Sequence, residues 1–230
     1  MVKKIFLFCV IIFFCIIFLT ACSINDEEKP SIESKITEEI EYIENKILTF
    51  LNMYAKDEYD LEEDLNWNLI EENAIDLNGI LDTIILDMTE VEISNETIIE
   101  FKNRVNNLSI AISNKDIDAT LEEYRLLYLL LPIYAEKIYS NKNELEILRL
   151  KSLAVSSYVL ANRSEWDEAK KTILETENKY KTMMDNVDYI KEYSYNLNKV
   201  FVLIGELRNA IELEELELTN IKYVNFIEKI

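Results

Sequence analysis

The chain has 230 residues, and its 24 basic and 44 acidic side chains give a formal net charge of −20. Apolar residues make up 49% of the sequence, so the chain can form a core and is not a disordered acidic tail. It contains two glycines, two prolines and no histidine. The few turn residues favour an all-α fold over strand-rich folds, and the lack of imidazole excludes histidine-dependent catalysis and histidine metal ligands.

The first 22 residues have the organisation of an export signal. Lys3 and Lys4 form a basic start, residues 5–19 are all apolar, and small residues lead to Cys22. The apolar run is shorter than the ~20 residues that a membrane-spanning helix needs. An uncleaved membrane helix is therefore the weaker of the two interpretations.

The segment LTAC (19–22) resembles the lipobox of bacterial lipoproteins. The resemblance implies that residues 1–21 are removed as a signal peptide and that Cys22 carries a diacylglyceryl group and a further acyl chain such as palmitate. Multiple acyl chains are sufficient for stable membrane anchoring. Cys9 and Cys15 would leave with the signal, so the mature chain would retain no free thiol for catalysis or a disulfide.

After a polar tether over residues 22–30, apolar residues recur at alternating steps of three and four, which is the pattern of amphipathic helices. We call each such row of apolar residues along one side of a helix a seam. Short polar turns between these seams predict an antiparallel helical bundle of six or seven amphipathic helices. Two stacked sub-bundles, residues 31–113 and 114–230, are one option for their arrangement. The helix boundaries near residues 184–188 and 212–230 are left open. The seams run from Ile36 to Tyr54, Trp67 to Met88, Ile98 to Ile112, Leu121 to Leu131, Ile147 to Ala161, Trp166 to Val187 and Tyr193 to Ile211.

A weak internal repeat is visible in two polar turns, NKDID (114–118) and RSEWD (163–167), which start 49 residues apart. A period near 50 residues suits stacked helical hairpins. The WDEAK start also resembles the second helix of a tetratricopeptide hairpin. The resemblance implies that Trp166, Ala169 and Ile173 take the aromatic, small and apolar packing positions. The glycine that marks the first helix of that family is absent. The resemblance therefore implies a similar packing of the two helices and not membership of the family.

Negative charge is concentrated in the first half of the chain. Residues 26–100 carry 23 acids and four bases, whereas residues 101–230 carry 21 acids and 18 bases. Such a field repels nucleic acids and anionic lipid headgroups, so neither is an expected partner. It favours cations or basic proteins, or it serves only as a solvated face; the sequence leaves both interpretations open.

The most specific candidate site lies in DEYDLEEDLNWNLIEEN (57–73). Four carboxylates and one indole fall at steps of 3-4-3-4, which places them on one face if the segment is helical. Carboxylates and an indole ring together suit a cationic ligand. The alternative is that the tryptophan belongs to the core seam that begins there. The five residues are Asp57, Asp60, Asp64, Trp67 and Glu71.

The same segment partly matches a calcium-binding EF-hand loop. Asp60, Glu62, Asp64 and Glu71 occupy positions 1, 3, 5 and 12 of such a loop. Position 6 requires glycine for a sharp turn, and this chain has Leu65 there. We therefore expect no specific metal site, and no cofactor.

Taken together, the sequence suggests a non-enzymatic, membrane-anchored extracytoplasmic helical lipoprotein that binds or scaffolds another extracytoplasmic protein. Its composition resembles that of uncharacterised all-helical lipoproteins of low-GC Gram-positive bacteria. The alternative is a ligand-capture component of a membrane transporter that recognises a cationic ligand in a pocket hinged near Pro132. A third hypothesis, a carboxylate-dependent hydrolase, requires two acids that face each other across a cleft.

Overall fold

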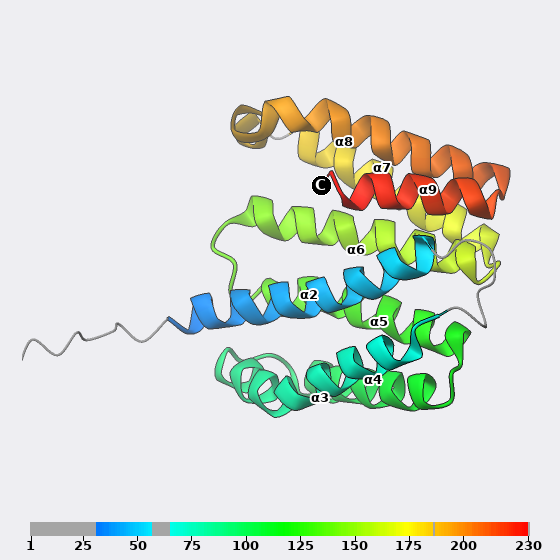
Figure 1. The fold of residues 1–230 in the computed structure, drawn as a ribbon. Helices are drawn as coiled ribbons and strands as arrows, with labels where there is room; N and C mark the ends of the chain where they lie inside the picture. The colour runs from blue at the N-terminus through cyan, green and yellow to red at the C-terminus, as the bar shows by residue number, and fades with distance from the viewer. Residues whose placement is uncertain (1–30, 57–64, 186, 230) are drawn as a thin grey trace, which may run out of the picture. The chain divides into compact units, whose positions relative to one another are not determined.

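The protein is helical almost throughout the part that the structure describes. The computed structural model describes residues 31–56, 65–185 and 187–229, with the backbone alone for residues 187–197. These residues form eight helices and no strand (Figure 1). The predicted all-α fold is therefore confirmed. The described residues form eight helices, whereas six or seven were expected.

The additional helix lies in the C-terminal segment that the sequence left open. The seven predicted seams correspond to α2 to α8, and the segment after Glu214 forms a separate helix, α9. The helices are α2 Ile32–Lys56, α3 Trp67–Glu90, α4 Asn95–Ser113, α5 Ile117–Ala135, α6 Lys142–Asn162, α7 Trp166–Met184, α8 Val187–Leu213 and α9 Leu216–Ile227.

Four of the helices begin at a side-chain cap. In each case the side-chain oxygen of the preceding residue accepts a hydrogen bond from a backbone N–H of the first turn, which otherwise has no partner within the helix. Asparagine, serine and aspartate are preferred for this role, so the local sequence sets where these helices start. The caps are Asn66 for α3, Ser94 for α4, Asp116 for α5 and Asn141 for α6.

Four helical hairpins share one type of turn. Glu92, Lys115, Ser164 and Glu214 have φ values of 58°, 54°, 61° and 58°, and each lies one or two residues after the last residue of a helix. The next residue donates its N–H back to the helix, for example from Asp116 to Ala111 O at 2.9 Å, which is a Schellman motif. The last three of these turns are 49 and 50 residues apart (164 − 115 and 214 − 164). This spacing agrees with the predicted period near 50 residues and shows how the chain turns tightly without glycine.

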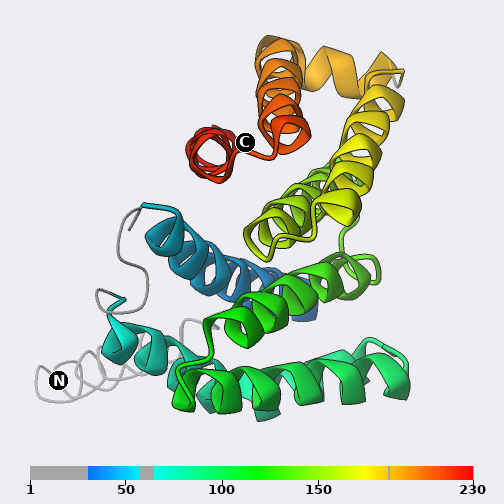
Figure 2. The same cartoon turned by 90° about the vertical axis from the view of Figure 1, so that its right-hand side faces the viewer.

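Helix α2 lies at the centre of the bundle. Helices α3 to α9 form a series in which each helix packs against its neighbours in the sequence. Helix α2 packs against α3 and also against α5 and α9, which come much later in the chain (Figure 2). It runs antiparallel to α3, because Lys35 contacts Asp87 and the later Lys46 contacts the earlier Asp76. Its predicted seam, Ile36, Ile40, Ile43, Ile47 and Phe50, is completely buried.

A single hydrophobic core extends from α2 to α9. Residues 32–230 form one compact unit, and α4 and α5, on either side of the proposed 113/114 boundary, pack together. The division into two sub-bundles stays a prediction. Ala169 and Ile173 are fully buried, and Trp166 is half-buried against the core, which fits the packing positions that the tetratricopeptide resemblance implied.

Candidate functional site

The predicted site residues fall partly outside the described part of the chain. Cys22 and the carboxylates of Asp57, Asp60 and Asp64 lie outside it. Of the remaining two residues, Trp67 is the first residue of α3 and is half-buried against the core, and Glu71 is exposed one turn later. Their grouping with the three aspartates stays a prediction.

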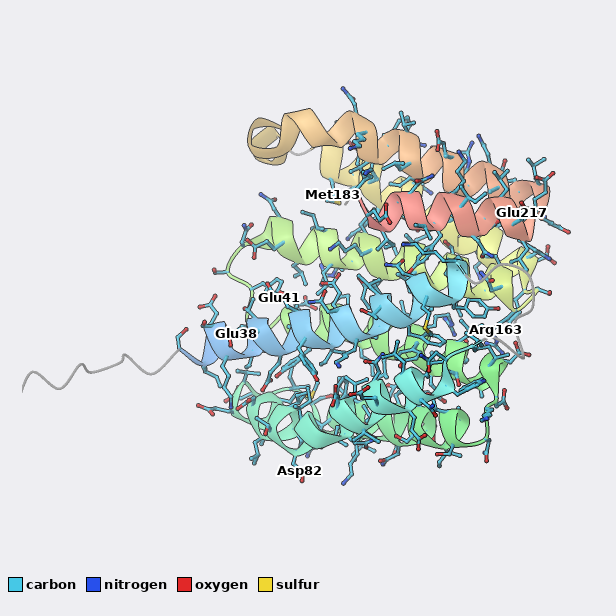
Figure 3. The ribbon with its side chains drawn as sticks, in the orientation of Figure 1. Glu38, Glu41, Asp82, Arg163, Met183 and Glu217 are labelled. Atoms are coloured by element: carbon cyan, nitrogen blue, oxygen red, sulfur yellow. The ribbon has the colours of Figure 1, made fainter. Side chains whose placement is uncertain are left out.

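Helix α3 and the start of α4 carry a surplus of acids without basic partners. Residues 65–113 contain nine acids and two bases, a net charge of −7 (2 − 9). Within this segment Asp76 and Asp87 are neutralised by lysines of α2, at 2.5 and 2.7 Å. We call the following six the acidic face, because they are exposed and have no ion pair among the described residues: Glu71, Glu72, Asp82, Glu90, Glu92 and Glu96 (Asp82 is labelled in Figure 3).

Several half-buried and buried acids of the C-terminal half are each paired with two bases. Burial alone raises the pKa of Glu122 and of Glu146, but two neighbouring bases outweigh it and lower both pKa values. Lys181 and Arg208 likewise lower the pKa of Glu177, although burial opposes them. Negative charge without a basic partner is therefore denser at the α3–α4 end than in the C-terminal half. The pairs are Glu122 with Arg125 and Arg163, Glu146 with Arg149 and Lys179, and Glu177 with Lys181 and Arg208.

Two further acids meet where α2, α3 and α5 pack together. The hydroxyl of Tyr134 donates to Glu39 Oε2 at 2.8 Å, and Lys35 Nζ lies 2.9 and 2.7 Å from the two oxygens of Asp87. Asp87 is only 4% exposed. Burial and the neighbouring Asp87 raise the pKa of Glu39 to about 7, so Glu39 gains or loses its proton near neutral pH.

Other side chains contact both carboxyl groups. Lys35 lies against both oxygens of Asp87, and the hydroxyl of Tyr134 donates to Glu39. The hydrolase hypothesis requires two acids that face each other across a cleft, and it stays a prediction.

Sequence reasoning missed this pair, because the local sequence does not distinguish Glu39 from the other glutamates of α2. The neighbouring Glu38 and Glu41 are exposed (Figure 3), whereas Glu39 and Glu44 are half-buried. Glu44 accepts a hydrogen bond from the hydroxyl of Tyr128 at 2.6 Å. No local signal separates these four glutamates, since their partners come from a helix that follows more than 80 residues later.

The hinge that the capture hypothesis placed at Pro132 is a buried position within a continuous helix. The predicted kink or end does not stop α5 there, because it continues to Ala135. Two shallow hollows lie on the described surface. One is on α4 and is lined by Glu96, Ile99, Glu100, Asn103, Arg104 and Asn107, and the other is at the start of α9 and is lined by Glu215, Leu216, Glu217, Leu218 and Ile221.

Among the residues that the structure describes, no three acidic or cysteine side chains are grouped so that they could hold a metal ion. None of the described helices combines the length and apolar character of a membrane span. Comparison with protein-family models, with curated proteins and with solved structures found no match to this chain. The proposals below therefore depend on the residues of this chain alone.

Proposed function

We propose that the protein is a non-enzymatic, lipid-anchored binding module on the extracytoplasmic face of the membrane. It recognises a basic segment of another extracytoplasmic protein through the acidic face. The observation that carries the proposal is the density of negative charge at one end of the bundle: residues 65–113 hold six exposed acids without an ion pair, whereas acids and bases are nearly balanced over residues 101–230.

Unpaired carboxylates at one end of a protein act on a partner before contact. Their field accelerates the approach of a basic partner and repels anionic competitors. Because the Debye length is about 8 Å at physiological ionic strength, this attraction weakens as salt is added. Binding that rests on the acidic face is therefore expected to depend strongly on salt.

The anchoring part of the proposal is supported by the organisation of residues 1–22. The tether from Ser23 to Pro30 has eight residues and, fully extended, spans roughly 26–29 Å. Helix α2, which follows directly, would then hold the acidic face within a few nanometres of the membrane. A partner in the same membrane, or bound to it, lies within that distance.

Anchoring is tested by expressing the full chain in a bacterial host supplied with radiolabelled palmitate. We expect label in the wild-type protein and in a Ser23→Ala control, and no label in Cys22→Ala. The labelled protein should sediment with membranes. Label that persists in Cys22→Ala, or a mature chain that still carries residues 1–21, would contradict the anchor.

Recognition is tested by titrating the full chain with a fluorescent lysine-rich peptide at low and physiological salt. Asp82→Lys should weaken binding by about three- to tenfold at low salt. The matched control Glu175→Lys makes the same change of charge at an exposed, unpaired position on α7 and should have little effect. Equal effects of the two variants would show that only net charge matters. Spermine binding without peptide binding would favour the ligand-capture alternative.

A further inference from the structure

We infer that the outer surface of α3 and α4 docks a cationic amphipathic helix, which deepens the proposed function and rests on it. Four large aliphatic side chains of these two helices are between 59% and 70% exposed. Exposed aliphatic residues that are grouped and surrounded by charged residues mark protein interaction sites. They are Ile75 and Leu86 on α3, and Ile99 and Ile110 on α4.

Each pair lies along one line of its helix. In both helices the two residues are 11 positions apart (86 − 75 and 110 − 99). Eleven residues correspond to almost three complete turns, so the two side chains of a pair point in nearly the same direction, about 16 Å apart. Each helix therefore presents two aliphatic contacts on a single side.

The two helices bring these contacts together in pairs. They are antiparallel neighbours, and Asn78 on α3 donates a hydrogen bond to Ser109 on α4 at 2.5 Å. In this register Leu86 is level with residue 101 and Ile75 with residue 112. Ile99 and Ile110 are thus each two residues from a partner on α3, which is about 3 Å along the axis. The surface has one aliphatic pair at each end.

Carboxylates accompany the aliphatic side chains. Glu71 is four residues before Ile75, and Asp82 is four residues before Leu86, so each acid lies one turn from an apolar contact on the same side of α3. The shallow hollow on α4 places Glu96 beside Ile99 in the same way. The surface thus alternates apolar contacts with unpaired negative charges.

This surface lies at an end of the stack of helices. Helix α3 packs against α2 and α4, and α4 packs against α3 and α5, so no described helix covers their outer sides (Figures 1 and 2). Helical-repeat proteins normally close such an end with a polar outer surface. Here four aliphatic side chains are exposed instead, which indicates a surface that a partner covers.

Charge decides which partner fits. A second copy of the chain would bring two sets of six unpaired acids together, and an anionic membrane would also be repelled. A helix with apolar residues along one side and lysine or arginine beside them matches both features. Its apolar residues would insert between the two aliphatic pairs, and its bases would meet the six acids.

The probe is an 18-residue peptide of leucine and lysine designed as an amphipathic helix, compared with a scrambled peptide of equal composition and with spermine. The full chain is held in neutral phosphatidylcholine nanodiscs, and the signal of empty nanodiscs is subtracted. We expect the amphipathic peptide to bind at least tenfold more tightly than the scrambled one. Ile75→Gln and Leu86→Gln should each weaken it about five- to tenfold and leave spermine binding unchanged.

The control is Leu174→Gln, which changes an exposed leucine on α7 and should have no effect. Equal binding of both peptides, unchanged in Ile75→Gln, overturns the inference but leaves recognition by charge intact. If neither peptide binds, the inference and the proposed recognition both fail. A dimer seen by sedimentation and abolished by Ile75→Gln would assign the surface to a second copy and also overturn the inference.

Discussion

Glu39 is expected to make the stability of the protein depend on pH in an unusual direction. Burial and Asp87 raise its pKa from 4.5 to about 7 in the folded protein, whereas the unfolded chain keeps an ordinary value. Between these two values the folded state retains a proton that the unfolded state has released. Stability from this group is therefore fully present below pH 4.5, falls as the pH rises to about 7, and stays lower above it.

The size of the effect follows from the two pKa values. A difference of 2.5 (7 − 4.5) corresponds to at most about 3.4 kcal/mol, at 1.36 kcal/mol for each pKa unit. Glu39 is only half-buried, so solvent screens part of this energy and we expect about 1–2 kcal/mol. Glutamine at position 39 can accept from Tyr134 and donate to Asp87 without ionising. Glu39→Gln should therefore stabilise the protein by this amount at pH 8 and remove the decline between pH 5 and 7.

The assay is urea unfolding followed by circular dichroism at a series of pH values from about 5 to 8, with the free energy of unfolding obtained by linear extrapolation. Glu38→Gln is the matched control, because it removes the same charge from the next residue of α2, which is exposed. The control corrects for the relief of general repulsion in an acidic protein. If the pH profiles of Glu39→Gln and Glu38→Gln are parallel, the reasoning about the Glu39–Asp87 pair is refuted.

Three further changes test the packing and the turns by the same unfolding assay. Tyr124→Phe should leave stability unchanged or raise it by about 1 kcal/mol, because its buried hydroxyl has no hydrogen-bond partner among the described residues. Tyr128→Phe, one turn further along α5, should cost about 1.5–3 kcal/mol, because it removes the hydrogen bond to Glu44; equal effects of the two would contradict the hydrogen-bond assignment. Lys115→Gly should stabilise the protein by about 0.5–1 kcal/mol, since glycine adopts a φ of 54° without strain; a loss of stability would show that the lysine side chain contributes more than the turn costs.

Much of the fold could be predicted from local patterns. The step of three and four residues identified the buried side of α2 from Ile36 to Phe50 and of α3 from Ile70 to Met88, and all of these seam residues are buried. The reason is that helical periodicity is a property of a single segment. Cap residues such as Ser94 and Asp116 also act locally, because each accepts a hydrogen bond from an N–H only three residues later. Helix ends were harder, because the chain turns at Lys115, Ser164 and Glu214 instead of at glycines.

The candidate site depended far more on tertiary structure. The sequence by itself determined the composition: many acids, no histidine, and a negative first half. It could not distinguish Glu39 from Glu38, because Asp87, which raises the pKa of Glu39, lies 48 residues away on α3, and Tyr134, which donates a hydrogen bond to Glu39, lies 95 residues away on α5. The alignment of Leu86 with Ile99 likewise exists only because α3 and α4 pack in one register. Periodicity determines which side of a helix is buried. Interactions between side chains are short-ranged, so which side chains interact is decided by the packing of one helix against another.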